Sequence, residues 1–381
     1  MPEQECDEVH PVCGNCQRYQ LSCIYEQRNS SRTPEPRSTE SRRASSESEG
    51  SAALSTSSTT ADPPESRRRR LLELGLLHQY TTRTSLTFLA ETSSAAAEVW
   101  TGSIPRIALQ YDALLYSIFS LAALHLHSTD PNNQEALDAY RQYLDLALRE
   151  HRHDVTHLSE ANADAACLTS SLLRMDTFTT LQQRPLHPYI PPTQWMQMTN
   201  SAGKVLKAAW RWIEGGQASN IRILLMREPL WSPLNQELFC ESNREGLAHL
   251  LRRNPAEGLA EPWDAETEEA YHSTLSYLGS VRKAIAAHEA PADTCRRLMI
   301  FPLMVPPRFI DLVEEQRPRA LVMLAYFFAH LTSYKNVWWV GDVGPREVHG
   351  IQSILPAEWQ HLMSWPLKAM DERAVPVELL M

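Results

Sequence analysis

The sequence predicts an all-α fold in which one large helical domain follows a short cysteine-rich segment and a polar linker. From Leu71 onward, apolar residues recur at steps of three and four, the spacing that places them on one face of a helix. Proline-containing breaks such as HPYIPP, EAPAD and MVPPR separate these segments, and the Asn-Gly and Asp-Gly turns typical of hairpins do not occur. We therefore expect stacked amphipathic helices over residues 67–381.

Two segments show the helical pattern clearly. The first carries, at helical spacing, Leu137, Tyr140, Leu144 and Leu148. Asp130 and Pro131 precede it, and the sequence predicts that they supply its N-cap and its first-turn proline. Pro318 is expected to open the second segment. One face of that segment carries Leu321, Leu324, Phe328 and Leu331.

Length and composition set limits on the class of protein. The chain has 381 residues, 43% of them hydrophobic, so it can bury a sizeable core. Its most apolar run, Ile107 to His127, contains polar residues that a span of about 20 residues in lipid would not tolerate, and we expect no membrane segment. The net charge is -10, so any contact with nucleic acid must come from a local basic patch.

Residues 28–66 form the predicted disordered linker between a segment at 1–27 and the helical domain. Ser, Thr, Arg, Glu and Pro dominate it, so it cannot bury enough apolar surface to offset the entropy lost on ordering. Within it, Ser45 follows Arg42 and Arg43 in a pattern that basophilic kinases accept, although such motifs also arise by chance in Arg/Ser-rich sequence. Ser45 is thus a candidate phosphorylation site.

Four consecutive arginines adjoin the first helical segment. They are Arg67, Arg68, Arg69 and Arg70. Such a run is typical of a nuclear-import patch or of a contact with the DNA backbone. It is also typical of the solvated start of a helix, and the sequence alone leaves both interpretations open.

Four of the seven cysteines are clustered near the start of the chain. The spacing C-x6-C-x2-C-x6-C is formed by Cys6, Cys13, Cys16 and Cys23. A two-residue loop lets both thiolates of a C-x-x-C reach one metal ion without strain, so the spacing predicts a zinc site. Disulfides and chance clustering are the alternatives. Disulfides are disfavoured because the chain opens with no apolar signal segment and the other three cysteines are scattered singly.

This segment resembles the second half of the cluster in fungal transcription factors that hold two zinc ions with six cysteines. The matching positions are Cys6, Asp7, Glu8, Pro11, Cys13, Cys16, Cys23 and Tyr25. In the family, another C-x-x-C and a turn rich in lysine and arginine come earlier, whereas this chain has no cysteine before Cys6. We therefore expect that the first exon lies upstream of Met1 or that the gene has lost it.

The charge of this segment bears on DNA binding. Residues 1–26 carry one arginine against five carboxylates, a net charge of -4, and DNA binding draws its affinity mainly from cations set against phosphates. The resemblance implies a basic helix in the major groove, so DNA is expected as a partner only if the upstream half of the cluster is restored. No leucine heptads follow the cluster, and a dimer or a second transcription factor is a further candidate partner.

The helical region resembles one branch of the same family, the sterol uptake control type of regulator. The stretch Leu71–Ala90 is similar to the opening of that branch's regulatory domain, and Arg317–Pro366 is similar to its closing segment. The resemblance implies a helical effector domain, which in the sterol-sensing members binds sterol in an apolar pocket. Because many relatives control other pathways, including secondary-metabolite clusters, we do not extend sterol identity to this chain.

Two groups of side chains are candidates for binding sites in the helical domain. The first is a candidate ligand pocket with the residues Trp338, Trp339, Trp359 and Trp365, although large aromatics are more often simply core. The second group is Glu150, His153 and His157, which share one helical face. A metal could bind there, but such residues at a polar helix end are usually solvated.

The common catalytic motifs do not occur in this sequence. We find no G-x-S-x-G elbow, G-x-G-x-x-G turn, P-loop or H-E-x-x-H pair. We therefore interpret the chain as a non-enzymatic, nuclear, sequence-specific regulator of RNA polymerase II transcription in a fungus, with an incomplete zinc segment and a ligand-responsive helical domain that controls sterol or secondary-metabolite genes. The alternatives are a DNA-binding-deficient regulator that acts through a partner protein, and a helical small-molecule-processing enzyme with a vestigial zinc segment.

Overall fold

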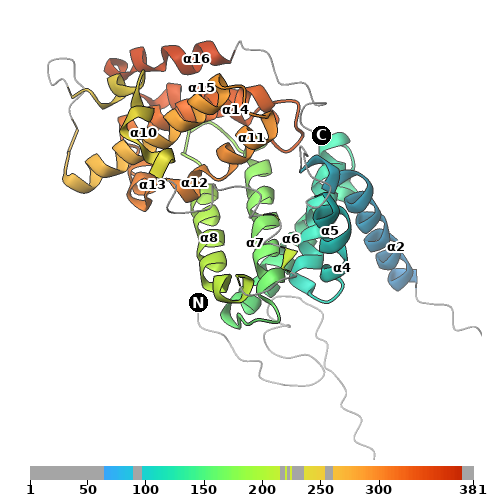
Figure 1. Ribbon diagram of the computed structural model, residues 1–381. Helices are drawn as coiled ribbons and strands as arrows, with labels where there is room; N and C mark the ends of the chain where they lie inside the picture. The colour runs from blue at the N-terminus through green and yellow to red at the C-terminus, as the bar shows by residue number, and fades with distance from the viewer. Residues whose placement is uncertain are drawn as a thin grey trace, which may run out of the picture. The chain divides into compact units, whose positions relative to one another are not determined.

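The computed structural model describes residues 64–88, 97–214, 219, 220, 224, 236–253 and 261–370 (Figure 1). All of them belong to one compact unit, Asp62–Met381. Every regular element among these residues is helical, and none of them forms a strand. The predicted all-α class is therefore confirmed.

The first half of the described chain consists of α-helices joined by short turns. Their bounds are Pro64–Gln79 (α2), Ile104–Ala108 (α4), Asp112–Thr129 (α5), Gln134–Thr156 (α6), Ala163–Thr179 (α7) and Thr193–Ile213 (α8). Single π-helical or 3-10 turns accompany them: Tyr80–Thr84 (η1), Ser85–Thr87 (η2), Val99–Ser103 (η3) and Thr180–Gln182 (η4). Helix α5 packs against α2, α4, α6 and α7 and so lies at the centre of this half.

The second half contains more and shorter helices. The α-helices are Ala265–Ala286 (α10), Pro291–Met299 (α11), Phe301–Met304 (α12), Pro307–Glu314 (α13), Pro318–Leu331 (α14), Val343–Ile354 (α15) and Ser364–Ala369 (α16). The 3-10 segments are Gln236–Phe239 (η6), Glu241–Arg244 (η7), Ala248–Leu251 (η8), Thr332–Tyr334 (η10) and Ala357–Met363 (η11). Proline stands in the first turn of α11 to α14, where its missing N–H costs no hydrogen bond.

The helices bury two hydrophobic cores. The N-terminal core is built from α2, η1, η3, α4, α5 and α6, and the C-terminal core from α10 to α16. Leu168 in α7 belongs to the N-terminal core and Phe178 to the C-terminal core, whereas Trp195 and Ile213 show that α8 passes between the cores in the opposite direction. The antiparallel helices α7 and α8, the upright green pair in Figure 1, therefore connect the two cores.

Helix α14 is the central element of the C-terminal core. Proline stands at its start, as predicted for Pro318, and the four residues of the predicted apolar face are buried. Every residue from Arg319 to Leu331 is buried, so the helix is covered on all sides and not on one face alone. It packs against α10, α13, α15 and α16. A helix that is apolar all round belongs in the interior of a large domain.

The predicted start of the helix at 134–156 is wrong by three residues. Asp130 caps the end of α5, and its carboxylate accepts a hydrogen bond from the backbone N–H of Asn132 at 3.1 Å. Asn133 is the true N-cap, since its side-chain oxygen accepts from the N–H of Ala136 at 2.9 Å. The Asp130-Pro131 pair therefore turns the chain between two helices and does not open the second one.

The apolar run Ile107 to His127 becomes the end of α4, a short break and most of α5. Most of its apolar side chains in α5 are buried in the N-terminal core, whereas Leu109 at the break is 68% exposed. Among the described residues, no helix combines the length and apolar character that crossing a membrane requires.

Candidate functional site

The predicted zinc ligands and the predicted phosphorylation site lie outside the described residues. These are Cys6, Cys13, Cys16, Cys23 and Ser45. Their assignment remains a prediction that rests on the sequence pattern.

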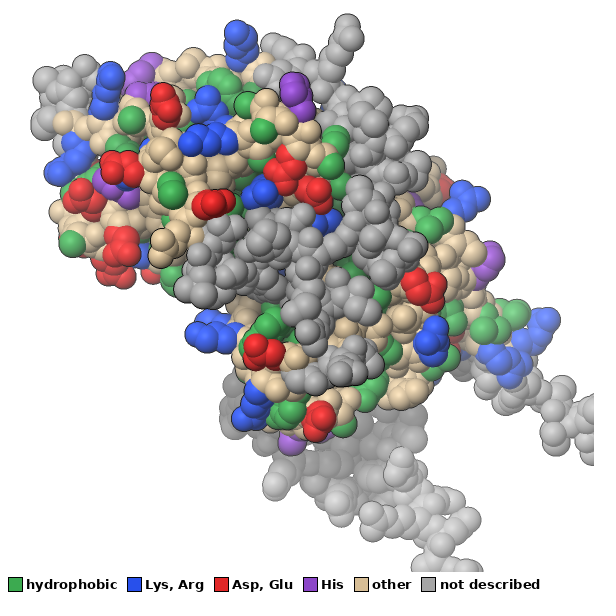
Figure 2. Space-filling model, viewed as in Figure 1, with side chains coloured by type: hydrophobic (Ala, Val, Ile, Leu, Met, Phe, Trp, Pro, Cys, Tyr) green, Lys and Arg blue, Asp and Glu red, His purple; other side chains and the backbone are tan. Residues whose placement is uncertain are grey.

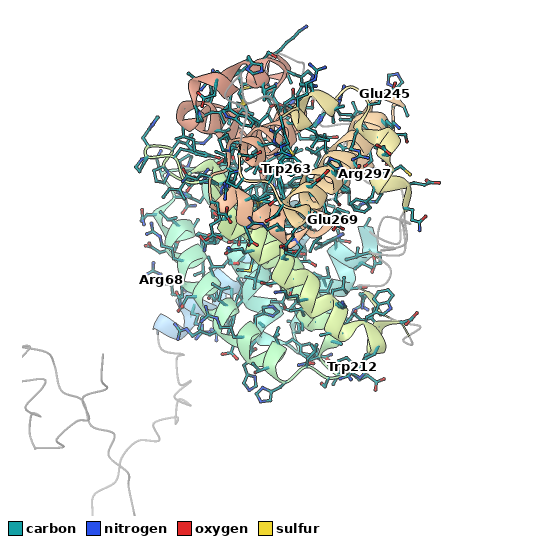
Figure 3. The ribbon with its side chains drawn as sticks, turned by 90° about the vertical axis from the view of Figure 1, so that its left-hand side faces the viewer. Arg68, Trp212, Glu245, Trp263, Glu269 and Arg297 are labelled. Atoms are coloured by element: carbon teal, nitrogen blue, oxygen red, sulfur yellow. The ribbon has the colours of Figure 1, made fainter. Side chains whose placement is uncertain are left out.

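The four arginines occupy the first half of α2 with exposed side chains. Arg68 Nη2 lies 3.0 Å from Glu135 Oε1 of α6, and Arg69 Nε lies 2.8 Å from Glu73 Oε1. Tyr143 donates a second hydrogen bond to Glu73 at 2.9 Å, which ties this carboxylate to α6. The arginine side chains in these two pairs are largely exposed to solvent. Exposed ion pairs of this kind contribute only about 0–1 kcal/mol to the stability of the fold. In Figure 3, Arg68 lies at the outer edge of the helical domain.

Trp338 and Trp339 lie at the junction of the two cores. The indole N–H of Trp338 donates to Thr87 Oγ1 at 2.7 Å, and that of Trp339 donates to the Thr87 carbonyl at 3.1 Å. The Trp338 ring stacks on His125 of α5, with ring centroids 4.2 Å apart and planes within 7°. Trp338 and Phe88 pack against both cores. The segment at Thr87 and Phe88 thus joins α5 to the tryptophan pair.

His125 is neutral in this junction. Its Nδ1 lies 3.0 Å from Thr84 Oγ1, and burial, helped by the charge of Arg83, lowers the pKa of His125 to about 4. A neutral imidazole accepts a hydrogen bond at one nitrogen and stacks on indole without a charge to solvate.

Trp359 and Trp365 contact other parts of the C-terminal core. The Trp359 ring lies under the guanidinium of Arg319, with Cζ 5.0 Å from its centroid, and Trp365 stacks on Tyr326 at 4.9 Å. Trp365 also approaches His330 of α14, at 4.9 Å between ring centroids. The contacts therefore place Trp338 and Trp339 at the junction of the two cores and place Trp359 and Trp365 along α14.

A buried ion pair in the C-terminal core escaped the sequence interpretation. Arg319 is 1% exposed, its Nε lies 2.5 Å from Glu261 Oε1, and its guanidinium also donates to the carbonyls of Leu250 and Arg252. The ring centroid of Trp263, which is labelled in Figure 3, lies 5.4 Å from Cζ of this guanidinium. Removing one partner of such a pair costs about 3–5 kcal/mol because the other charge is left buried. No sequence pattern indicated this pair, since Glu261 and Arg319 are 58 positions apart in the chain.

A second buried ion pair joins the loop after η4 to α15. Both guanidinium arms of Arg184 reach the carboxylate of Glu347, at 2.7 and 2.5 Å, and Tyr189 donates to the same carboxylate at 2.8 Å. Glu347 is fully buried. The fork geometry satisfies the carboxylate, which fits a structural role in fixing this loop.

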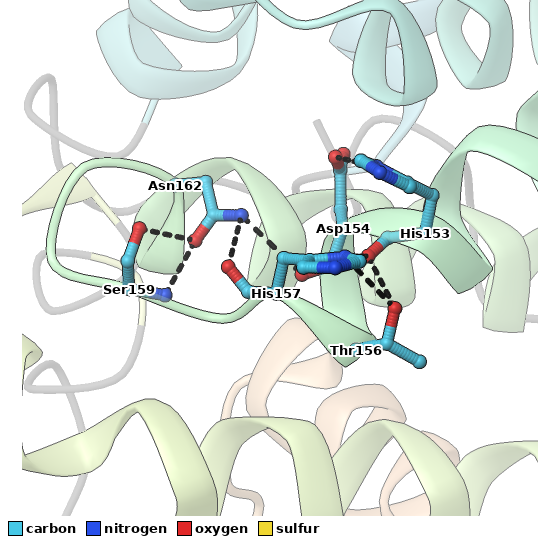
Figure 4. Close-up of polar contacts among 6 residues, drawn as sticks. All are labelled: His153, Asp154, Thr156, His157, Ser159 and Asn162. Atoms are coloured by element: carbon cyan, nitrogen blue, oxygen red, sulfur yellow. Dashed lines mark hydrogen bonds and ion pairs between the residues drawn. The ribbon is translucent and has the colours of Figure 1, made fainter.

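The histidine group at the end of α6 has the contacts of a helix terminus (Figure 4). His157 caps the helix, and its Nδ1 lies 3.0 Å from the His153 carbonyl, while His153 Nδ1 lies 3.8 Å from Asp154 Oδ1. Asn162 donates to the carbonyls of Asp154 and His157 at 3.3 Å. No group of three or more metal-ligating side chains occurs within the described part of the chain. Of the two interpretations of this group, the solvated helix end is the one that these contacts support.

Comparisons with known proteins show which family the chain belongs to. A family model described as the fungal specific transcription factor domain matches residues 75–199, from α2 into α8. The chain is 33% identical over 320 residues to the Zn(2)-C6 fungal-type transcription factor afumD of Aspergillus fumigatus, and the match covers 84% of this chain and 79% of that protein. The chain belongs to the Zn(2)-C6 fungal-type transcription factor family. It is a fungal transcription regulator.

Further relatives extend this assignment. A Zn(2)-C6 fungal-type transcription factor of Gibberella zeae is 28% identical, with 98% of this chain and 85% of that protein covered. Sterol uptake control protein 2 of Saccharomyces cerevisiae is 23% identical, and the match covers 76% of this chain but 30% of that protein. The resemblance to the sterol uptake control regulators, noted at both ends of the helical domain, is thus confirmed.

Proposed function

We propose that this chain acts in the nucleus as a zinc-dependent, DNA-binding regulator whose helical domain at 67–381 controls its activity. The observation that carries the proposal is the match to a Zn(2)-C6 transcription factor over 84% of the chain. The buried cores and ion pairs of the helical domain support a stable regulatory unit, and its sequence lacks the common catalytic motifs.

We assign zinc to the cysteines at 6, 13, 16 and 23. Their spacing supports a tetrahedral thiolate site, which when loaded would hold the segment in one conformation. Metal analysis of the full chain before and after a chelator tests this assignment. Zinc in stoichiometric amount that is lost on Cys13→Ser and Cys16→Ser supports it, and a chain that purifies without zinc from zinc-rich medium contradicts it.

DNA binding is tested by selection from a randomised oligonucleotide pool at near-physiological salt. Because residues 1–26 carry a net charge of -4, the chain as printed should enrich no motif, and residual binding through the α2 arginines should fall steeply with salt. A form extended upstream by an in-frame C-x-x-C and its basic turn should enrich a defined half-site. Enrichment by the short form contradicts the first expectation. Failure of the extended form favours a regulator that acts through a partner protein.

We also propose that the helical domain binds a small apolar ligand beside the tryptophans at 338, 339, 359 and 365, so that tryptophan fluorescence reports the binding. Trp338 and Trp359 lie in different surroundings, one stacked on His125 and one beside Arg319. Tryptophan emission of the full chain, titrated with a sterol and with unrelated apolar compounds, should change saturably for one class. The variants Trp338→Phe and Trp359→Phe then show which ring responds. Recovery of a chemically altered compound would support the enzyme alternative instead.

A further inference from the structure

The outer face of α2 combines exposed leucines with arginines. Leu71 is 53% exposed and Leu74 is 59% exposed, and both belong to a helix whose opposite face buries Leu76 in the N-terminal core. Arg67, Leu71, Leu74 and His78 follow one another at steps of four, three and four, so they form one stripe along the helix. Two leucines more than half exposed on one helix face are unusual in a helix that only covers a core.

Gly75 leaves open space beside this stripe. A Cβ added at Gly75 would meet no atom within 4 Å, so none of the residues that the structure describes packs against this position. A residue without a side chain on an exposed helix face lets the backbone of a second helix approach closely. The leucines and Gly75 therefore form a shallow apolar surface. In Figure 2, hydrophobic and Lys/Arg side chains lie side by side at the edge of the molecule where Figure 1 places the start of α2.

The charge of this surface decides what fits it. Its titratable side chains are Arg67, Arg70 and His78. Arg68 lies beside them and pairs with Glu135 of α6. Glu73, in the following turn, faces α6 and bonds Tyr143 and Arg69. A second copy of α2 laid across the stripe would bring the arginines of the two copies toward one another. A DNA backbone could pair its phosphates with the arginines, but both leucines would then stay exposed to water.

We propose that the outer face of α2, formed by Arg67, Arg70, Leu71, Leu74, Gly75 and His78, is a docking surface for an acidic amphipathic helix of a partner protein. The partner's apolar residues cover Leu71 and Leu74, and its carboxylates lie against the arginines at the N-terminal half of α2. Such helix-on-helix recognition uses apolar anchors at three- and four-residue spacing, with charge complementarity to select the partner. The inference concerns a surface of the helical domain and does not depend on zinc or DNA binding.

The probe is a synthetic helical peptide with leucines on one face and glutamates on its flanks. Fluorescence anisotropy with the full chain at near-physiological salt should show saturable binding, and a matched peptide with lysine in place of every glutamate should bind at least roughly tenfold more weakly. Leu74→Ser and the double change Arg67→Ser with Arg70→Ser should each weaken binding roughly tenfold. The control Leu109→Ser, at a leucine that is 68% exposed elsewhere on the domain, should leave binding unchanged.

Gly75→Gln separates docking from folding. Replacing glycine within a helix raises the thermal midpoint because glycine has a low helix propensity. The added side chain occupies the open space at Gly75, so the peptide can no longer approach closely and its binding weakens. The proposal is overturned if the glutamate peptide does not bind, if the lysine peptide binds equally well, or if Leu109→Ser is as harmful as Leu74→Ser. It is also overturned if the arginines bind duplex DNA while the peptide does not bind, or if sedimentation shows a dimer that Leu74→Ser dissociates.

Discussion

Asp176 is a buried carboxyl group that makes the stability of the helical domain depend on pH. It is 3% exposed on α7, where its Oδ2 accepts a hydrogen bond from Tyr140 at 3.1 Å and its Oδ1 has no hydrogen-bond partner. Burial raises the pKa of Asp176 to about 7, an effect that the Tyr140 hydrogen bond opposes. The folded chain therefore holds a proton on this group at pH values where the unfolded chain has released it.

The magnitude follows from linkage. In the unfolded chain an aspartate titrates near its ordinary value of about 3.9, so the stabilisation is complete below pH ~4 and is lost as the pH rises to about 7. Each pH unit in this window lowers the free energy of unfolding by about 1.4 kcal/mol, which gives about 4 kcal/mol in total. Asp176→Asn stays neutral throughout and keeps an acceptor for Tyr140, although its amide N–H groups take the place of the unpartnered Oδ1 at a cost of about 1–3 kcal/mol.

Urea unfolding of the native chain and of Asp176→Asn, followed by circular dichroism from pH 4.5 to 8.5, measures this difference. The stability of the variant relative to the native chain should rise with pH up to about pH 7 and then stay constant. Tyr140→Phe removes the donor that stabilises the carboxylate and should move the upper limit of the window to higher pH. Asp145→Asn, at an exposed carboxylate paired with Arg149, should give a curve parallel to that of the native chain. Parallel curves for Asp176→Asn would refute the reasoning.

Three further predictions concern the fold and the metal. Gly344→Ala places a Cβ 2.7 Å from the Phe328 carbonyl, where α14 and α15 approach, and should lower the free energy of unfolding in urea by about 1–3 kcal/mol; Gly75→Ala, in open space on a helix, should raise it by about 0.5–1 kcal/mol. Limited proteolysis should cut between Arg28 and Arg70 and leave a stable helical fragment, identified by its mass and its circular dichroism. Native mass spectrometry of residues 1–30 should show at most one zinc ion, whose binding weakens at low pH as the thiols are protonated.

The outcomes that contradict these predictions are distinct. Equal effects of the two glycine substitutions would mean that α14 and α15 do not pack closely. A protease-resistant linker would contradict the domain boundary, and a fragment that unfolds once released would show that the helical domain is not autonomous. Two zinc ions per peptide would require ligands beyond the four cysteines.

The sequence predicts helices well where a residue constrains the backbone locally. Pro318 opens α14 because proline fits the first turn and little else in a helix. Asp130 and Asn133 are both good capping residues, and local propensity could not choose between them. The choice depends on where the preceding helix ends, since Asp130 has extended backbone angles at the end of α5.

Contacts between distant parts of the chain could not be predicted in this way. The partner of Trp338 is Thr87, 251 positions earlier, and the partner of Arg319 is Glu261, 58 positions earlier. Neither pair lies at a spacing that secondary structure brings together. The aromatic richness of the closing segment was visible in the sequence, but only the fold divides its rings between the junction and α14.

Residues 84–87, which follow α2, form hydrogen bonds to side chains of both hydrophobic cores. Thr84 and Thr87 lie on consecutive turns directly after α2, where Thr84 bonds His125 of α5 and Thr87 bonds Trp338 and Trp339. Any displacement of the C-terminal end of α2 must therefore shift or break hydrogen bonds to both α5 and the tryptophan pair. Because the ring of Trp338 also stacks on His125, these bonds form one connected network and not two separate attachments. A partner bound to the outer face of α2 and a ligand bound beside the tryptophans would therefore both act on residues 84–87, and Thr87 is the residue that contacts the tryptophan pair.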